Sequence, residues 1–219
     1  MQEIGQIIRL QIQVDSLKSG QRPFVTYSPA HILSVNSLRL TPQGAWGLLP
    51  DGPPVMDAHH EAHHAHKYRG NNGLSLNFSS HYGRIQERFG ERLAMGSAGE
   101  NILVETAQPY TLAQLGHRLL IQSGNGHTTA LHQISVAAPC EPFSRYCLNL
   151  GSQPPAAAMK ATLQFLDNGM RGFYLTVASS SPQFPPVPQK NSGELGGVQE
   201  PLQETAVTIH LGDRLFLDN

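Results

Sequence analysis

The sequence predicts a mainly β protein that forms one domain. Its 219 residues are enough for one sizeable hydrophobic core, and a β-rich domain of this length is common. The chain contains 21 glycines and 16 prolines, which favours short strands joined by turns. Residues 4–14 alternate between apolar and polar side chains, the period of a strand with one buried face. We expect the even-numbered apolar residues from Ile8 to Val14 on the buried face and Gln11 and Gln13 on the opposite one.

Further strands follow along the chain. Residues 15–29 are polar, with Gly20 and Pro23 as turn signals, and 44–54 form a loop rich in glycine and proline. Residues 79–92 have the apolar spacing of an amphipathic helix, whereas 156–164 suit either a helix or an irregular strand. The remaining strands are expected at 32–40, 73–78, 102–105, 118–122, 128–136, 173–178 and within 205–217.

Composition narrows the class of partner and the compartment. Charged residues make up 14% of the chain and the net charge is -1, so neither a nucleic acid nor a membrane surface is an expected partner. No apolar run reaches the 18 or more residues of a spanning helix, and the N-terminus lacks the pattern of a signal peptide. Two cysteines are too few for a disulfide framework. We therefore expect a soluble cytoplasmic protein with reduced thiols.

The stretch from Gly96 to Cys147 carries the first candidate site. Its Gly-rich turn presents Gly99, Glu100 and Asn101 ahead of a predicted strand, and glycine there lets the backbone approach a ligand closely. The acid and the amide can bind a ligand edge through paired hydrogen bonds, or they can form an Asx-type turn into the strand. Farther on, Cys140 follows a proline at the end of another strand. It is either a small buried hydrophobe or a reactive thiol at the mouth of a sheet or barrel.

Taken together and in order, these motifs resemble the MOSC domain family, named for the C-terminal domain of molybdenum cofactor sulfurases. The resemblance covers most of the chain. Its pieces are Gly96 with Gly99-Glu100-Asn101-Ile102, then Leu115-Gly116-His117-Arg118-Leu119, then Ala138-Pro139-Cys140, and late in the chain Arg171-Gly172-Phe173-Tyr174 and Gly212-Asp213.

The resemblance implies a single antiparallel β-barrel over residues 1–219, with a few peripheral helices and the site at one barrel mouth. It implies the molybdenum cofactor (molybdopterin) as the bound group. The protein would transfer or handle sulfur for that cofactor, or use it to reduce N-hydroxylated compounds. Cys140 would be the catalytic residue, as sulfur carrier or molybdenum ligand. A redox or sulfur-donor protein would be a partner, and a non-catalytic carrier of the cofactor or of sulfur is an alternative.

A second candidate site lies in residues 56–70, which hold five of the 11 histidines. His60, Glu61 and His64 form an H-E-x-x-H motif. On a helix the two histidines would share one face and could bind zinc, with Glu61 as general base. A zinc-dependent hydrolase is therefore an alternative function, although the segment is short and its surroundings are predicted to be β. The plainer interpretation is a solvated His-rich loop.

The resemblance places the same segment beside the cofactor pocket. Asp57 and His59 are the nearest match to a Gly-Asp-x-His-like element of the family, without its glycine. His66 and Arg69 are further candidates to meet an anionic cofactor. With Gly99, Glu100 and Asn101, these residues form the expected cofactor-binding set.

The sequence departs from the family pattern at two places. Many members carry a basic residue three positions before the cysteine, where this chain has Ala137. If that residue normally meets the pterin phosphate, another cation must replace it, and Arg69 and Arg171 are the candidates. In addition, residues 179–204 form a long Ser-, Pro- and Gly-rich stretch, which we expect to be a flexible surface insertion and a contact segment for a partner.

Overall fold

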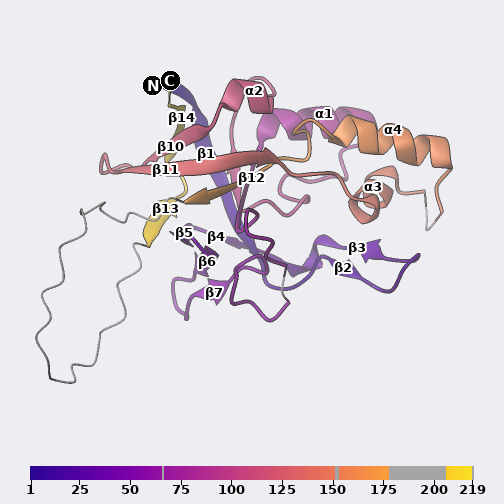
Figure 1. Cartoon of the computed structure of the whole chain (residues 1–219), viewed down its shortest axis with the longest axis horizontal. Coiled ribbons are helices and arrows are strands. Elements are labelled where there is room, and N and C mark those ends of the chain that lie inside the picture. The colour runs from indigo at the N-terminus through magenta and orange to yellow at the C-terminus, as the bar shows by residue number, and fades with distance from the viewer. Residues whose placement is uncertain (66, 151–152, 178–205, 219) are drawn as a thin grey trace, which may run out of the picture.

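The computed structural model of the chain describes residues 1–65, 67–150, 153–177 and 206–218 (Figure 1). The expected insertion at 179–204 and the candidate His66 lie outside the described residues. The large sheet contains β1 (Gln2–Gln13), β4 (Ile32–Val35), β8 (Leu74–Phe78), β9 (Ile102–Val104), β10 (Arg118–Gln122), β11 (Thr128–Val136), β12 (Phe173–Val177) and β14 (Arg214–Leu217). The other elements are β2 (Lys18–Ser19), β3 (Thr26–Tyr27), the 3-10 helix η1 (Pro29–His31), β5 (Ser37–Thr41), β6 (Gly44–Leu48), β7 (Val55–Met56), β13 (Val207–His210), α1 (Ser79–Phe89), α2 (Leu112–Leu115), α3 (Glu141–Leu148) and α4 (Ala156–Leu166).

Seven strands close into a barrel. They follow the order β14-β10-β11-β12-β8-β9-β1, and β1 pairs with β14 to complete the ring. Six of the seven neighbouring pairs are antiparallel, but β8 and β9 are parallel. The barrel is therefore mixed, which corrects the expectation of an antiparallel one. The reason is the connection: α1 and the loop after it carry the chain back across before β9 begins, as parallel neighbours require.

Strand β1 bends, and the bend changes which side chains it buries. Its pairing register shifts between Ile7 and Arg9. A bulge of this kind reverses the alternation of faces, so Ile7 is 1% exposed whereas Ile8 is 39% exposed. Toward the end of the strand the opposite face is also covered, because Gln11 and Gln13 are buried. This buried polar face was not expected, and it becomes part of the site.

Several other segments differ from the expected ones. The strand predicted at 32–40 is two strands, β4 and β5, interrupted at Asn36. Residues 44–48, expected in a loop, form β6, because each pairs in register with a residue of β5. The segment 15–29 contains the β2–β3 hairpin. Residues 156–164 lie in the helix α4. Helices α2 and α3 were not predicted.

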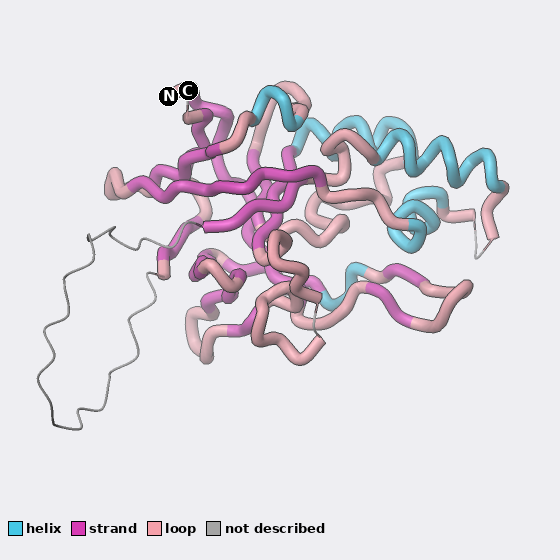
Figure 2. Tube along the Cα trace, in the orientation of Figure 1, coloured by secondary structure: helices cyan, strands magenta, loops and turns pink. Residues whose placement is uncertain are grey.

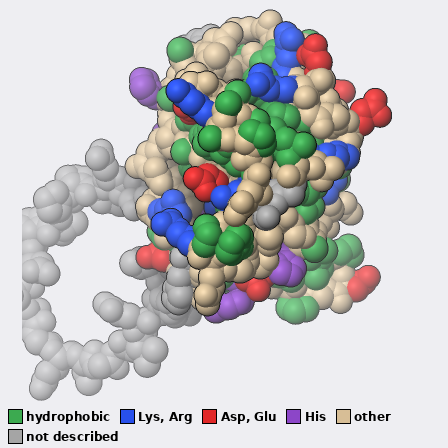
Figure 3. Space-filling model, turned by 90° about the vertical axis from the view of Figure 1, so that its right-hand side faces the viewer, with side chains coloured by type: hydrophobic (Ala, Val, Ile, Leu, Met, Phe, Trp, Pro, Cys, Tyr) green, Lys and Arg blue, Asp and Glu red, His purple; other side chains and the backbone are tan. Residues whose placement is uncertain are grey.

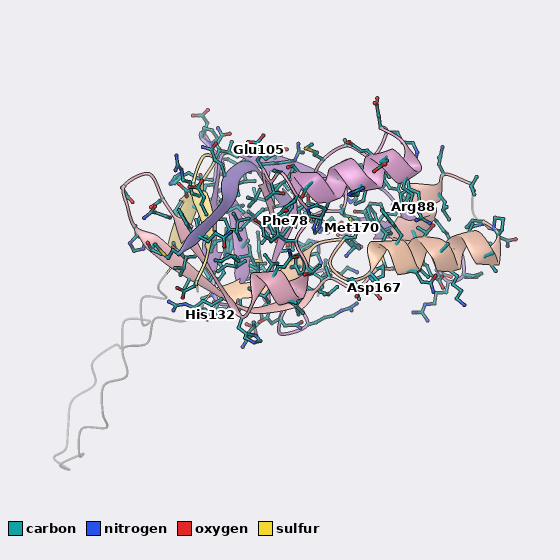
Figure 4. The ribbon with its side chains drawn as sticks, turned by 90° about the horizontal axis from the view of Figure 1, so that it is seen from above. Phe78, Arg88, Glu105, His132, Asp167 and Met170 are labelled. Atoms are coloured by element: carbon teal, nitrogen blue, oxygen red, sulfur yellow. The ribbon has the colours of Figure 1, made fainter. Side chains whose placement is uncertain are left out.

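Helices α1, α3 and α4 lie together to one side of the barrel, whereas α2 lies over the strands and packs Leu112 and Leu115 into the barrel core (Figures 1 and 2). The molecule therefore has two apolar clusters. The barrel interior includes Phe78, near the middle of the view from above (Figure 4). The second cluster joins Tyr82 of α1 to Phe143 of α3. Between α1 and α4, the Arg88 guanidinium lies 4.6 Å from the centroid of the Phe165 ring (Figure 4). No helix in the described ranges is long and apolar enough to cross a membrane.

Candidate functional site

A cavity of about 350 Å³ lies at one end of the barrel. Strands β1 and β11 end there, and β8, β9 and β12 begin there. Residues from segments far apart in the sequence therefore meet around one space, which is how barrel mouths build binding sites. Six of the predicted site residues line the cavity: His59, Arg69, Gly99, Glu100, Cys140 and Arg171.

The turn before β9, which contains Gly96 and Gly99, is hydrogen-bonded to side chains of β1. The side-chain amides of Gln11 and Gln13 donate to the carbonyls of Gly96 and Gly99 over 2.7 and 2.6 Å. Gly99 has a φ of +83°, and a Cβ atom there would come within 2.7 Å of the Gln13 amide nitrogen and of a Leu17 methyl group. Glycine is required because the backbone has both a left-handed conformation and no room for a side chain.

Asn101 supports the site without lining it. Its side-chain oxygen accepts from the backbone N–H and the hydroxyl of Ser75, over 3.0 and 2.9 Å. Its side-chain nitrogen donates to Gln11 O over 3.2 Å and to Asp57 Oδ2 over 2.9 Å. Both ends of the amide are therefore used within the protein, and the residue is 2% exposed. Asn101 thus ties β8, β9 and the segment around Asp57 together.

Asp57 is fully buried beneath the cavity and orients His59. Its Oδ2 accepts from the backbone N–H of Gln13 over 2.8 Å, and its Oδ1 accepts from the backbone N–H of His59 over 2.8 Å. The same Oδ1 lies 3.1 Å from His59 Nδ1, so it accepts that ring proton when Nδ1 is protonated. His59 lines the cavity with its ring fixed by a buried carboxylate.

Glu100 is 4% exposed, yet it lines the cavity. Its Oε2 accepts from the Tyr82 hydroxyl over 2.9 Å, and that hydroxyl accepts from the backbone N–H of Ala98. Its Oε1 is buried and has no hydrogen-bond partner. Burial raises the pKa of the Glu100 carboxyl to about 7, against the opposing hydrogen bonds and the charge of Arg171.

Cys140 is half-buried and stands directly before α3, as its N-cap residue. Its backbone is extended, and its carbonyl accepts from the backbone N–H and the hydroxyl of Ser144, both over 3.0 Å. The second cysteine, Cys147, is 1% exposed near the other end of α3, and burial raises its pKa to about 12. Only Cys140 presents a thiol to the cavity.

Arg171 lies next to Ala137, the position at which the family pattern has a basic residue. The backbone N–H of Ala137 donates to Gly172 O over 3.0 Å, so the start of β12 runs next to the end of β11. The Arg171 guanidinium lies 5.3 Å from the centroid of the Phe143 ring. Burial alone would lower the pKa of Arg171, but the acidic groups of Cys140, Tyr174 and Tyr27 raise it above its usual range. Arg171 is therefore a permanent cation in the cavity.

Two lysines, missed in the sequence, add to the positive charge of the cavity. Lys67 and Lys18 line it together with Arg69 and Arg171. The loop that carries Lys67 and Arg69 is closed by Asn72, whose side chain accepts from Arg69 N over 2.6 Å and donates to Lys67 O over 2.9 Å. Elsewhere on the helical end of the molecule, basic side chains are scattered among apolar and acidic ones (Figure 3).

The sequence contains different amounts of information about the three site residues that were not predicted, Lys67, Lys18 and Tyr82. Lys67 is a cation in the segment that already held Arg69, so charge alone could have suggested it. Lys18 lies in an unremarkable polar turn. Tyr82 has the helical spacing of a core residue, and only the fold brings its hydroxyl to Glu100.

The His-rich segment does not form the helix that the zinc hypothesis required. Residues 57–65 follow successive turns, in which the Nδ1 atoms of His60 and His63 accept from the backbone N–H two residues on, over 3.1 and 3.0 Å. Both histidines are 6% exposed rather than solvated, and burial lowers the pKa of His63. His60 and His64 therefore do not share a helical face. Within the described ranges, no three His, Cys, Asp or Glu side chains gather as metal ligands.

Comparison with known proteins identifies one matching family. The MOSC domain profile matches residues 63–183, which is more than half of the chain. No curated protein matches the sequence. Among solved structures, the YuaD protein from Bacillus subtilis aligns over 97% of both chains, with 12% identity and a TM-score of 0.48. A hypothetical protein aligns over 98% of this chain and 67% of its own, with 12% identity and a TM-score of 0.49.

Proposed function

Because the chain belongs to the MOSC domain family, we propose that its cavity binds the molybdenum cofactor with the Cys140 thiol at the cavity wall. The observation that carries this proposal is the shared lining. One cysteine, one buried glutamate and four basic residues line the same space of about 350 Å³. The volume lies within the range of small-molecule and cofactor pockets.

The residues fit the chemical parts of this cofactor. A phosphate group suits Arg69, Arg171 and the two lysines, because guanidinium and ammonium groups form charge-assisted hydrogen bonds with phosphate oxygens. The nitrogen-rich edge of a pterin suits a carboxylate acceptor, and Glu100 lines the cavity. A soft thiolate is a suitable ligand for a transition metal, and it can also carry sulfur. When bound, the molybdenum centre would supply two-electron redox chemistry, and the chain would supply orientation and charge.

Two activities are consistent with this arrangement, and both use Cys140. The protein transfers or handles sulfur for the cofactor, or it reduces N-hydroxylated compounds with the bound cofactor and a redox partner. Sulfur carriage would rest on Cys140 alone, because Cys147 is buried. A carrier that delivers the cofactor to another protein is the second candidate, and binding without turnover would favour it.

The deciding measurement is the molybdenum and zinc content of untagged protein purified from a host that makes the cofactor. We expect near-stoichiometric molybdenum in the wild-type protein and little in Cys140→Ala if the sulfur ligates the metal. Cys147→Ala is the matched control and should keep its molybdenum. A folded wild-type protein without molybdenum would contradict cofactor binding, and a fully loaded and active Cys140→Ala variant would contradict the role of the thiol.

A further inference from the structure

The loop formed by residues 67–72 is closed by the side chain of its last residue, Asn72. Asn72 is 5% exposed and lines the cavity. Its Oδ1 accepts from the backbone N–H of Arg69 over 2.6 Å, and its Nδ2 donates to the carbonyl of Lys67 over 2.9 Å. Because leaving these buried groups unpaired would be costly, Asn72 fixes the backbone from which both basic side chains extend.

Three cations at the cavity are unpaired within the described residues. They are Lys67, Arg69 and Lys18 of β2, and none of their charged groups takes part in an ion pair or hydrogen bond there. Elsewhere on the surface, Arg118 is paired with Asp218. The lining of the cavity contains four basic residues and one acidic residue, although the net charge of the whole chain is -1. Positive charge concentrated in this way attracts an anionic ligand.

The 67–72 loop and Arg171 reach the cavity from opposite ends of one strand pair. Strands β8 and β12 are antiparallel, with Leu74 opposite Leu175 and Leu76 opposite Phe173. The loop lies just before β8 and Arg171 just before β12, so they lie beyond opposite ends of this pairing. Arg171 belongs to the end near the thiol, because a charge on Cys140 acts on it. A bound molecule can therefore place an anionic group at the loop and its reacting group at the thiol.

We propose that Asn72 is the positioning residue of a phosphate-binding loop, residues 67–72, and that this loop makes the cavity select phosphorylated ligands over their unphosphorylated forms. The inference rests on the proposed function and narrows it, because it assigns the phosphate of the cofactor to one end of the cavity. A guanidinium donates to two phosphate oxygens at once, and the ammonium groups add charge. The neutral amide of Asn72 holds the loop without neutralising these cations. A carboxylate at this position would also accept from Arg69, but it would compete with the phosphate.

A matched pair of fluorescent pterins tests this selectivity. The probes are 6-hydroxymethylpterin and its phosphate monoester, which differ only in the phosphate group. The whole chain is purified from a host that cannot make the molybdenum cofactor, and the Kd of each probe is measured by fluorescence titration. We expect the wild-type protein to bind the ester at least about tenfold more tightly, because hydrogen bonds between charged groups are the strong ones. Added salt should weaken this preference.

Two substitutions of Asn72 test its role. Asn72→Ala removes both loop bonds, so the preference for the ester should fall about fivefold or more, whereas the Kd of the unphosphorylated probe should change less than about twofold. Asn72→Asp keeps the acceptor for Arg69 but loses the donor for Lys67, and its charge repels phosphate, so the preference should fall here as well. If Asn72→Ala does not fold, Asn72→Asp decides on the same measurement.

Two comparisons separate positioning from a general structural role. Asn125→Ala is the matched control, because the Asn125 side chain accepts from the backbone N–H of His127 over 3.0 Å and closes a turn that does not line the cavity. The second comparison is a double-mutant cycle with Arg69→Ala. If Asn72 acts through Arg69, its substitution should change the preference much less once Arg69→Ala is present.

A preference that is present in wild type and Asn125→Ala, reduced in the folded Asn72 variants and coupled to Arg69 supports the proposal. A folded Asn72 variant that keeps the preference, an equal loss of affinity for both probes, or additive effects in the cycle overturns it. Circular dichroism establishes folding of each variant. Molybdenum content in a host that makes the cofactor separates the two levels. A wild-type protein that is loaded but does not prefer the ester refutes the loop alone, whereas one that contains no molybdenum and binds neither probe refutes the proposed function and the loop with it.

Discussion

The side-chain amide of Gln13 donates to the carbonyl of Gly99 over 2.6 Å, across 86 positions of sequence. This bond fixes the distance between the end of β1 and the turn that presents Glu100. Gln11 repeats the contact at Gly96 over 2.7 Å. The polar face of β1 thus supports the wall of the cavity. Gly96 and Gly99 are needed in the turn because the side chains of Gln11 and Gln13 lie too close to leave room for a Cβ atom.

Replacing Gly99 by alanine should destabilise the protein. The residue has a φ of +83°, and a Cβ atom would lie 2.7 Å from both the Gln13 amide nitrogen and a Leu17 methyl group. Backbone strain and overpacking together should lower the free energy of unfolding by about 2–4 kcal/mol. Urea denaturation measures this. Gly124→Ala is the control, because nothing lies within 4 Å of its added Cβ. Equal stability of the two variants would argue against the close approach of Gln13 and Leu17 to Gly99.

The two thiols should differ sharply in reactivity. Cys140 lines the cavity, whereas Cys147 is 1% exposed and burial raises its pKa to about 12. Because the thiolate is the nucleophile, iodoacetamide at neutral pH should modify Cys147 about 100-fold or more slowly than Cys140 in the folded protein. Peptide mass spectrometry after timed quenching measures both rates. Unfolding in urea should abolish the difference, and similar rates before unfolding would show that α3 opens readily.

His81 should make the fold sensitive to acid. Burial lowers its pKa to about 4. Its Nε2 lies 3.0 Å from the backbone nitrogen of Tyr110 and 3.1 Å from the carbonyl oxygen of the same residue, so protonation of that nitrogen would exchange the bond it accepts for one that it donates, and the main cost is the burial of the charge. Its pKa in the unfolded chain is about 6.5, so the unfolded state binds the proton first as pH falls. The free energy of unfolding should drop by about 3 kcal/mol between pH 7 and pH 4 through this residue.

Glu100 acts in the opposite direction, so the contribution of His81 is best measured as a difference. The raised pKa of Glu100 gives stability at low pH that is lost as pH rises from about 4.5 to about 7. Subtracting the stability of His81→Gln from that of the wild-type protein at each pH cancels this effect. The exposed His127→Gln serves as control. A difference that does not change with pH would show that His81 is not buried as a neutral ring.

Arg171 should be replaceable by a cation at position 137. Removing it in Arg171→Ala takes one of four cations from the cavity, and we expect molybdenum content to fall several-fold. Because Ala137 lines the same cavity and pairs with Gly172, Ala137→Arg in the Arg171→Ala background should restore much of the content. Arg84→Ala, on the exposed side of α1, is the control. If the double variant contains as little molybdenum as Arg171→Ala, a cation at position 137 does not reach the ligand.

Local patterns in the sequence determined the elements that depend on neighbours in the chain. Strands β10 and β11 have the predicted bounds, 118–122 and 128–136, because two runs rich in apolar and β-branched residues flank a short polar turn. Helix α1 begins at Ser79 as expected but ends at Phe89, short of the predicted end at Arg92, because Gly90 caps it. The Gly-Glu-Asn turn and the cysteine after β11 were also readable, because each is a short contiguous motif. Prediction failed where periodicity was interrupted, as at the bulge beside Ile7.

Tertiary structure alone decided what surrounds those motifs. Three contacts of the site join segments that are far apart in the sequence. They are the bond from Gln13 to Gly99, across 86 positions, the bond from Tyr82 to Glu100, across 18 positions, and the bond between Ala137 and Gly172 that places Arg171 beside Ala137. The parallel pairing of β8 with β9 and the turns of the H-E-x-x-H segment were likewise settled by packing. The physical reason is that a side chain's burial and partners depend on which distant segment covers it, whereas propensity and periodicity report only local preference.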